Sequence, residues 1–233
     1  MGFLHWLLDA ELHVGGSTVL WREIVGNAFG LASVLLGLRR AVWTWPVGMV
    51  GNVLLFTVFL GGAFTTPQAV DLYGQAGRQV FFFSVSVYGW WRWSRNRRVG
   101  QSPDHGAVVP RWASWRERLW LLLAAAVGTA LAYPLLAALG SWGPLPDAWI
   151  LVGSLLATYG MARGWVEFWL IWIAVDAVGV PLLLDGGFYP SASMYALYGL
   201  FCVWGFVSWL RTSRTLRRAA RGPLVAGYAE AVA

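Results

Sequence analysis

The chain has 233 residues, of which 58% are hydrophobic and 12% are charged, and its mean hydropathy is +0.57. A typical soluble domain carries about 25% charged residues, so this composition excludes an ordinary soluble globule and favours a membrane-embedded chain. The single cysteine, Cys202, excludes an intramolecular disulfide and a cysteine-based metal cluster. The three histidines lie outside the apolar segments, so we expect no cofactor and no metal site.

Seven mainly apolar segments approach the roughly 20 residues that a helix needs to cross a bilayer. A short apolar patch before them, residues 3–8, is followed by Asp9 and Glu11, which is not typical of a signal peptide. We expect it to be an interfacial segment. The predicted spans are 22–38, 41–60, 76–93, 118–139, 147–163, 166–184 and 191–210.

The net charge of +6 comes from 17 basic residues that are all arginine, and their distribution predicts a topology. With seven spans, fifteen of them fall on one side, in the first, third and fifth interhelical loops and the C-terminal segment. Arg22 and Arg78 fall on the other side. Cytoplasmic loops are enriched in Arg and Lys, so we expect the N-terminus outside and the C-terminus in the cytoplasm. This pattern accounts for the Arg-rich 94–117 loop without a nucleic-acid partner.

Self-comparison indicates that the first three spans are repeated as the last three. Arg39, Trp45, Asn52, Gly62 and Phe64 match Arg163, Trp169, Asp176, Gly186 and Phe188 at an offset of 124. Gly89 and Trp93 then match Gly205 and Trp209 at an offset of 116.

An odd helix between two repeats makes them parallel, an arrangement found among transporters. We therefore predict an all-α integral membrane protein with seven transmembrane helices in a 3+1+3 order. Its predicted parts are an extracellular segment 1–21, a first repeat 22–93, a basic cytoplasmic loop 94–117, a linker helix 118–139, a second repeat 147–210 and a basic, mostly disordered cytoplasmic tail 211–233.

Strongly polar residues at membrane depth usually face a cavity, because they are costly in lipid. Asn52 and Asp176 are such residues and are repeat equivalents, so we expect them to line opposite walls of one cavity. Asp176 is the stronger candidate, because a lone carboxylate needs a partner or water. Gln79 and its counterpart Tyr195 occupy equivalent places on the third helix of each repeat. The candidate substrate-binding residues are Trp45, Asn52, Gln75, Gln79, Trp172, Asp176, Tyr195 and Tyr198.

Other interpretations exist for several of these residues. Asn52 would alternatively hydrogen-bond a neighbouring helix, and Trp172 would alternatively be a packing residue. Near the cytoplasmic side, Glu167 is four residues after Arg163, which predicts an i, i+4 salt bridge. Tryptophans at the span ends are expected to form interfacial belts: Trp43, Trp90, Trp91, Trp93, Trp165 and Trp209.

Amides, one carboxylate, Tyr and Trp together suit a flat heteroaromatic ligand that carries hydroxyls, since the rings stack and the polar groups hydrogen-bond. Four segments then resemble the PnuC family of bacterial vitamin transporters over about residues 22–210. They are WTWPVGMVGN, GQAGRQVFFFSVSVYGWWRW, PDAWILVGSLLATYGMARGWVEFWLIWIAVDAVGVPL and SMYALYGLFCVWGFVSW.

This resemblance implies a SWEET-like fold, a homo-oligomer that is often a trimer, and a location in the bacterial inner membrane. It also implies uptake by facilitated diffusion, with nicotinamide riboside ahead of riboflavin, trapped afterwards by cytosolic phosphorylation. The WVEFW stretch and VDAVGVPL resemble the family's riboflavin carrier, and some relatives have Asn in place of Asp176. An integral-membrane enzyme is a distant alternative, because enzymes of that kind need several convergent acidic or histidine groups.

Overall fold

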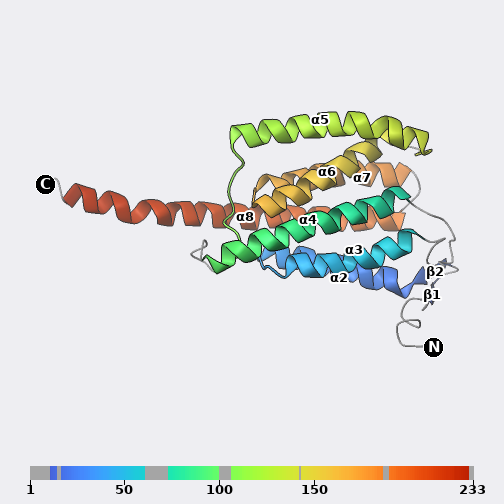
Figure 1. Ribbon diagram of the computed structural model, residues 1–233, viewed down its shortest axis with the longest axis horizontal. Helices are drawn as coiled ribbons and strands as arrows, with labels where there is room; N and C mark the ends of the chain where they lie inside the picture. The colour runs from blue at the N-terminus through green and yellow to red at the C-terminus, as the bar shows by residue number, and fades with distance from the viewer. Residues whose placement is uncertain are drawn as a thin grey trace. The chain divides into compact units, whose positions relative to one another are not determined.

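The computed structural model describes residues 11–14, 17–60, 73–99, 106–141, 143–185 and 189–230 (Figure 1). Every predicted span is confirmed as a helix, and the described ends agree within five residues except at the end of the last helix. The seven helices in the described ranges are α2 (Trp21–Leu38), α3 (Thr44–Phe59), α4 (Tyr73–Arg98), α5 (Trp115–Ala138), α6 (Pro144–Arg163), α7 (Glu167–Asp185) and α8 (Tyr189–Glu230).

Two short elements near the N-terminus were not predicted. Strands β1 (Glu11–Val14) and β2 (Ser17–Leu20) pair antiparallel, with Glu11 opposite Leu20. The second strand contains β-branched residues, which favour an extended backbone. Leu20 is 1% exposed and directly precedes α2, so the hairpin leads without a loop into the first helix.

The expectation of a disordered tail after residue 210 is wrong, because α8 continues as one helix to Glu230. The segment RTSRTLRRAAR is composed largely of residues with high helix propensity, which extends the helix beyond its apolar part. Ser213 lies three residues beyond the predicted end and is 2% exposed. The beginning of this basic extension is therefore packed against protein.

The helices belong to two compact units, residues 1–96 and 97–233. In the first unit α2 packs along α3. Two reciprocal hydrogen bonds join these helices: Thr44 Oγ1 donates to Ser33 O at 2.6 Å, and Ser33 Oγ donates to Thr44 O at 2.8 Å. A Cβ placed on Gly51 would lie 3.0 Å from Gly26 O, so a glycine is needed at this close crossing.

In the second unit α6 lies between α5 and α7, and α7 packs in turn along α8 (Figure 1). The buried positions of α6 are mostly small, as at Ala148, Ala157 and Ala162, which are fully buried. A Cβ placed on Gly153 would lie 2.6 Å from a methyl group of Val175 on α7. Small residues let helices approach closely in a bilayer, where no hydrophobic effect drives them together.

Helix α5 exposes many apolar side chains, and their contact with water would be energetically unfavourable. Its only buried residue in the described chain is Leu121, whereas Leu122 is 65% exposed and Leu131 is 70% exposed. By length and mean hydropathy, α5 and α6 are the two described helices long and apolar enough to cross a membrane, and Thr44–Phe59 is a shorter apolar helix. A helix that is apolar on its exposed faces is typical of contact with lipid.

Candidate functional site

The contact between α7 and α8 is built from large or polar side chains that face glycines. On α7, Trp169, Asp176 and Gly179 lie at helical spacing along one face. A Cβ placed on Gly205 would lie 2.6 Å from the ring of Trp169, and one on Gly179 would lie 2.5 Å from the ring of Tyr195. At Gly205 and at Gly179, therefore, only a glycine leaves enough room for the aromatic ring of the facing helix.

Between these two levels, Asp176 faces Gly199 of α8. A Cβ on Gly199 would lie 3.6 Å from both the Cβ and the Oδ2 of Asp176, which is an ordinary van der Waals distance. Unlike Gly205 and Gly179, Gly199 is therefore not required by packing. The glycine leaves room for about one methyl group beside the carboxylate.

Asp176 is 7% exposed, and its Oδ2 has no hydrogen-bond partner among the described residues. The buried Cys202 lies near the same carboxylate, on the face of α8 that also carries Gly199. A buried acceptor without a donor is costly, because water satisfied it before folding. Such a group in a membrane helix is a candidate for a functional site.

The first unit repeats part of this arrangement at the matching positions. Trp45 of α3 is 3% exposed, and a Cβ on Gly89 of α4 would lie 2.5 Å from its ring. Trp45 meets Trp93 edge to face at 5.2 Å, as Trp169 meets Trp209 at 6.1 Å. Neither indole Nε1 of the matched pair Trp45 and Trp169 has a hydrogen-bond partner among the described residues. The predicted duplication is thus matched by the same local packing in each unit.

The remaining predicted site residues are placed as follows. Asn52 is half-buried on α3, and Gln79 is 4% exposed on α4. Trp172 and Tyr198 are half-buried on α7 and α8. Gln75 lies in α4, but its side chain is outside the described residues. Trp45, Asn52 and Gln79 therefore belong to the first unit, whereas Trp172, Asp176, Tyr195 and Tyr198 belong to the second.

Sequence reasoning missed Cys202 and Gly199 as neighbours of Asp176. A usable signal was present, because Tyr195, Gly199 and Cys202 are spaced i, i+4, i+7 and so share one face of α8. Trp43, Trp90 and Trp91 are exposed, at 65%, 47% and 57%, which is compatible with the belt prediction. It was wrong for Trp93, Trp165 and Trp209, which are buried because they pack against other aromatic rings or arginines.

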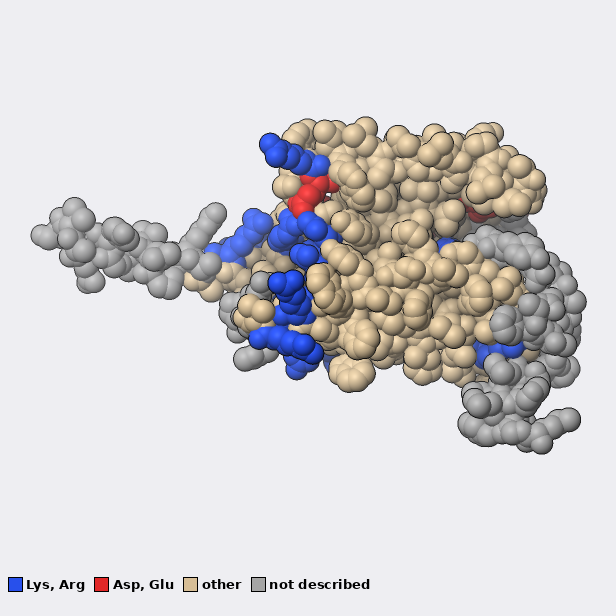
Figure 2. Space-filling model, viewed as in Figure 1, with Lys and Arg blue, Asp and Glu red and all other residues tan. Residues whose placement is uncertain are grey.

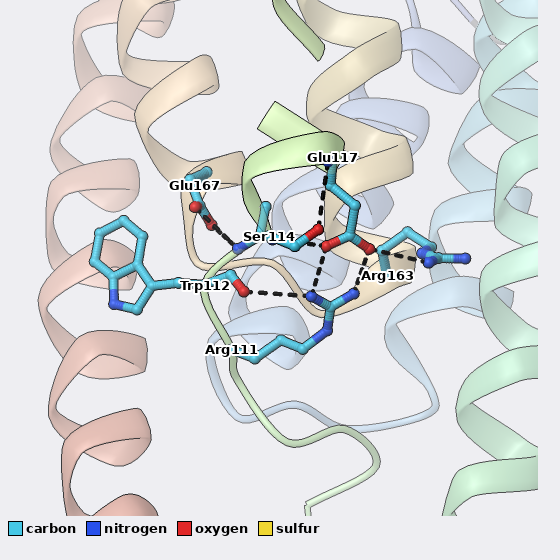
Figure 3. A network of polar contacts seen from close by, with 7 residues as sticks. Arg111, Trp112, Ser114, Glu117, Arg163 and Glu167 are labelled. Atoms are coloured by element: carbon cyan, nitrogen blue, oxygen red, sulfur yellow. Dashed lines mark hydrogen bonds and ion pairs between the residues drawn. The ribbon is translucent and has the colours of Figure 1, made fainter. Parts of the chain in front are cut away.

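A network of ion pairs ties the segment before α5 to the turn between α6 and α7 (Figure 3). Arg111 binds Glu117 through two bonds, at 2.8 and 2.6 Å, and Arg163 binds the same carboxylate at 3.2 Å. Ser114 and Glu117 also form a capping box at the start of α5. Charge-assisted, two-point pairing of this kind fixes orientation as well as distance.

The predicted salt bridge between Arg163 and Glu167 is wrong. Glu167 instead pairs with Arg118 at 2.9 Å and accepts the backbone N–H of Ala113 at 3.0 Å. The physical reason is Gly164, whose φ of +74° ends α6, so Arg163 and Glu167 lie on different helices. The i, i+4 spacing brings side chains together only within one continuous helix.

Backbone and ring contacts complete this junction. Arg111 and Trp165 form a parallel bridge, with Arg111 N donating to Gly164 O at 3.0 Å and Val166 N donating to Arg111 O at 2.9 Å. The buried ring of Trp165 contacts the guanidinium groups of both Arg111 and Arg163. These arginines thus have structural partners within the second unit.

Arginines gather at one end of each unit's helices. In the second unit they lie where α6 ends and α5 and α7 begin, next to the acidic pair Glu117 and Glu167 (Figure 2). In the first unit Arg92 and Arg95 lie in the last turns of α4, whereas Arg22 and Arg78 lie near the starts of α2 and α4. The end of α4, the end of α6 and the start of α5 therefore carry several arginines, as the arginine distribution in the sequence predicted.

The described part of the chain thus has seven helices, of which α5 and α6 are long and apolar enough to cross a membrane, and this arrangement fits a multi-spanning membrane protein. The chain matches the Nicotinamide mononucleotide transporter family over residues 20–211, and it belongs to this family. Its members include the PnuC vitamin transporters, so the resemblance seen in the sequence is confirmed.

Individual relatives agree with this assignment. The riboflavin/roseoflavin transporter RibM of Streptomyces davaonensis is 40% identical over 226 residues, which cover 94% of this chain and 99% of that protein. The nicotinamide riboside transporter PnuC of Escherichia coli is 25% identical, covering 89% of this chain and 92% of that protein. The crystal structure of the vitamin B3 transporter PnuC aligns with a TM-score of 0.64 over 84% of this chain and 83% of that one, at 22% identity, which shows a shared fold.

Proposed function

We propose that this protein is an inner-membrane facilitator for vitamin uptake and that riboflavin is its substrate. The observation that carries the proposal is the buried carboxylate of Asp176, whose Oδ2 has no hydrogen-bond partner among the described residues, three residues before Gly179, over which the ring of Tyr195 lies. A flavin is a flat heteroaromatic molecule with N–H and O–H donors, which is the chemistry that such a face recognises. The 40% identity to RibM over nearly the whole of both chains supports this choice.

Nicotinamide riboside is the second candidate. The family match and the PnuC relatives favour it, and it too combines a heteroaromatic ring with sugar hydroxyls. The eight predicted residues remain candidate substrate ligands for either vitamin: Trp45, Asn52, Gln75, Gln79, Trp172, Asp176, Tyr195 and Tyr198.

The mode of transport is facilitated diffusion, with phosphorylation by a cytosolic kinase retaining the vitamin. The protein is not an enzyme, which agrees with relatives that are named transporters. The basic helix ends favour an orientation with the N-terminus outside and the C-terminus in the cytoplasm. We further propose a homo-oligomer, a trimer by family resemblance, in direct contact with the lipid bilayer.

Purified protein in proteoliposomes tests this function. Uptake of labelled riboflavin and of labelled nicotinamide riboside is measured with and without a pH gradient, against empty vesicles. We expect saturable riboflavin uptake that does not need the gradient and that unlabelled riboflavin inhibits more strongly than unlabelled riboside. Preference for the riboside would select the second candidate, and transport of neither vitamin would contradict the proposal.

A further inference from the structure

We propose that the exposed arginines at the start of the α8 extension form a binding surface for the anionic headgroups of the phospholipids around the protein. This surface lies outside the candidate substrate residues, so the inference holds for either vitamin. We call it the basic stripe, and its members are Arg211, Arg214, Arg217 and Arg218.

The four arginines of the basic stripe share one side of α8. Successive residues of an α-helix are turned by roughly 100°, so these positions fall within an arc of about 120°. All four side chains are exposed. The other side of the same turns is covered, since Ser213 is 2% exposed and Thr212 and Leu216 are half-buried. The protein therefore packs one side of the extension and leaves the basic side accessible.

The charge of the basic stripe is not balanced within the described residues. The arginines of the junction before α5 each pair with a glutamate, at 2.6–3.2 Å, whereas no ion pair among the described residues involves the stripe. The sequence agrees, because residues 186–229 contain no Asp or Glu. Arg214 lies three residues after Arg211 and four before Arg218, and like charges at these spacings destabilise a helix. A partner with negative charge would offset this repulsion.

The position of the basic stripe favours lipid headgroups as that partner. The predicted lipid-spanning part of α8 ends at Leu210, directly before the stripe. At about 1.5 Å per residue, Arg218 lies only about 12 Å further along the helix axis. Long arginine side chains near helix ends reach back toward the membrane interface. Basic clusters next to a membrane helix attract anionic lipids, and guanidinium groups bind phosphate oxygens through two donors.

The test places an environment-sensitive fluorophore beside the basic stripe. Thr215 is exposed and Cys202 is the only cysteine, so Thr215→Cys in a Cys202→Ser background gives a single label. The full chain is reconstituted into vesicles of phosphatidylcholine or of an equal mixture with phosphatidylglycerol. We expect emission at shorter wavelength in the mixture, and high salt should remove this shift. Each Arg→Gln change in the stripe should lower the ratio of headgroup-bound to unbound extension about fivefold.

Variants with the same fold separate charge from other causes. Changing all four arginines to glutamine should abolish the effect of phosphatidylglycerol on emission, and changing all four to lysine should preserve it, because lysine keeps the charge. Arg116→Gln removes one exposed positive charge outside the stripe and is the matched control, with unchanged emission expected.

Three outcomes would overturn the inference. They are equal emission in the two kinds of vesicle, a lipid effect that survives the four glutamines, and a shift that an added oligonucleotide produces in phosphatidylcholine vesicles while phosphatidylglycerol produces none. If the labelled variant does not fold, Tm in detergent replaces emission. Short-chain phosphatidylglycerol should raise the Tm of the unaltered protein more than that of the four-glutamine variant, and equal rises would overturn the inference too. None of these measurements depends on transport.

Discussion

The ring of Trp169 lies directly over Gly205, where a Cβ would come within 2.6 Å of three ring atoms. The equivalent Trp45 lies over Gly89 in the same way, at 2.5 Å. Each tryptophan then meets a second one edge to face, Trp209 and Trp93 respectively. A contact that recurs in both repeats with the same three residue types is a requirement of the fold in each.

Gly205→Ala should therefore destabilise the protein, because the added methyl group forces the Trp169 ring out of its position. Overpacking of this kind costs about 1–3 kcal/mol. Thermal unfolding in detergent measures the effect as a lower Tm. Gly77→Ala is a matched control, since a Cβ at Gly77 meets nothing within 4 Å. Equal Tm values for the two variants would contradict the packing argument.

Glu117→Gln should weaken the junction before α5, because Glu117 holds both Arg111 and Arg163. Glutamine keeps an oxygen for the N–H of Ser114 and so preserves part of the capping box. These side chains are partly exposed, so the expected loss is on the order of 1 kcal/mol, and it should shrink at high salt. Melting curves at low and high ionic strength check this. Arg116→Gln changes an exposed charge in the same segment and should have no such effect.

Asp176→Asn should make the protein more stable and less active. Replacing a buried carboxylate whose Oδ2 has no donor among the described residues removes a desolvation penalty of about 1–3 kcal/mol or more, whereas the vitamin loses its charged acceptor. The measurements are Tm and riboflavin uptake on the same preparations. A substitution that lowers both stability and uptake would indicate a structural role for Asp176 instead.

Cys202 should react slowly with a maleimide in the folded protein. It is the only cysteine in the sequence and is 6% exposed, so labelling reports this position alone. Reaction should become fast and stoichiometric in denaturant, with Cys202→Ser as the unreactive control. Rapid labelling of the native protein would contradict the burial of this part of α8.

The arginine distribution predicts a cytoplasmic C-terminus. A C-terminal green fluorescent protein fusion should fluoresce in bacterial cells, and a C-terminal alkaline phosphatase fusion should be inactive, since the phosphatase needs the oxidising periplasm. The reverse pattern would overturn the proposed orientation. Fusions after residue 62, in the loop between the second and third predicted spans, should give the opposite result and serve as the internal control.

The sequence by itself determined the seven helices and indicated a duplication. Span length and apolarity decide which segments become membrane helices, and both can be read along the chain. The constant offset that joins Trp45 to Trp169 and the one that joins Gly89 to Gly205 identified positions that pack alike. The helical extension after residue 210 was missed, because hydropathy marks where a helix leaves lipid and not where it ends.

Only the tertiary structure decided which residues meet. Glu167 pairs with Arg118 across 49 positions and not with its neighbour Arg163, because Gly164 breaks the helix between them. Likewise, Gly199 and Cys202 are neighbours of Asp176 only because α8 packs against α7. Periodicity assigns a residue to a face of its own helix, but the partner across that face depends on how two helices cross, and that is set by packing over the whole unit.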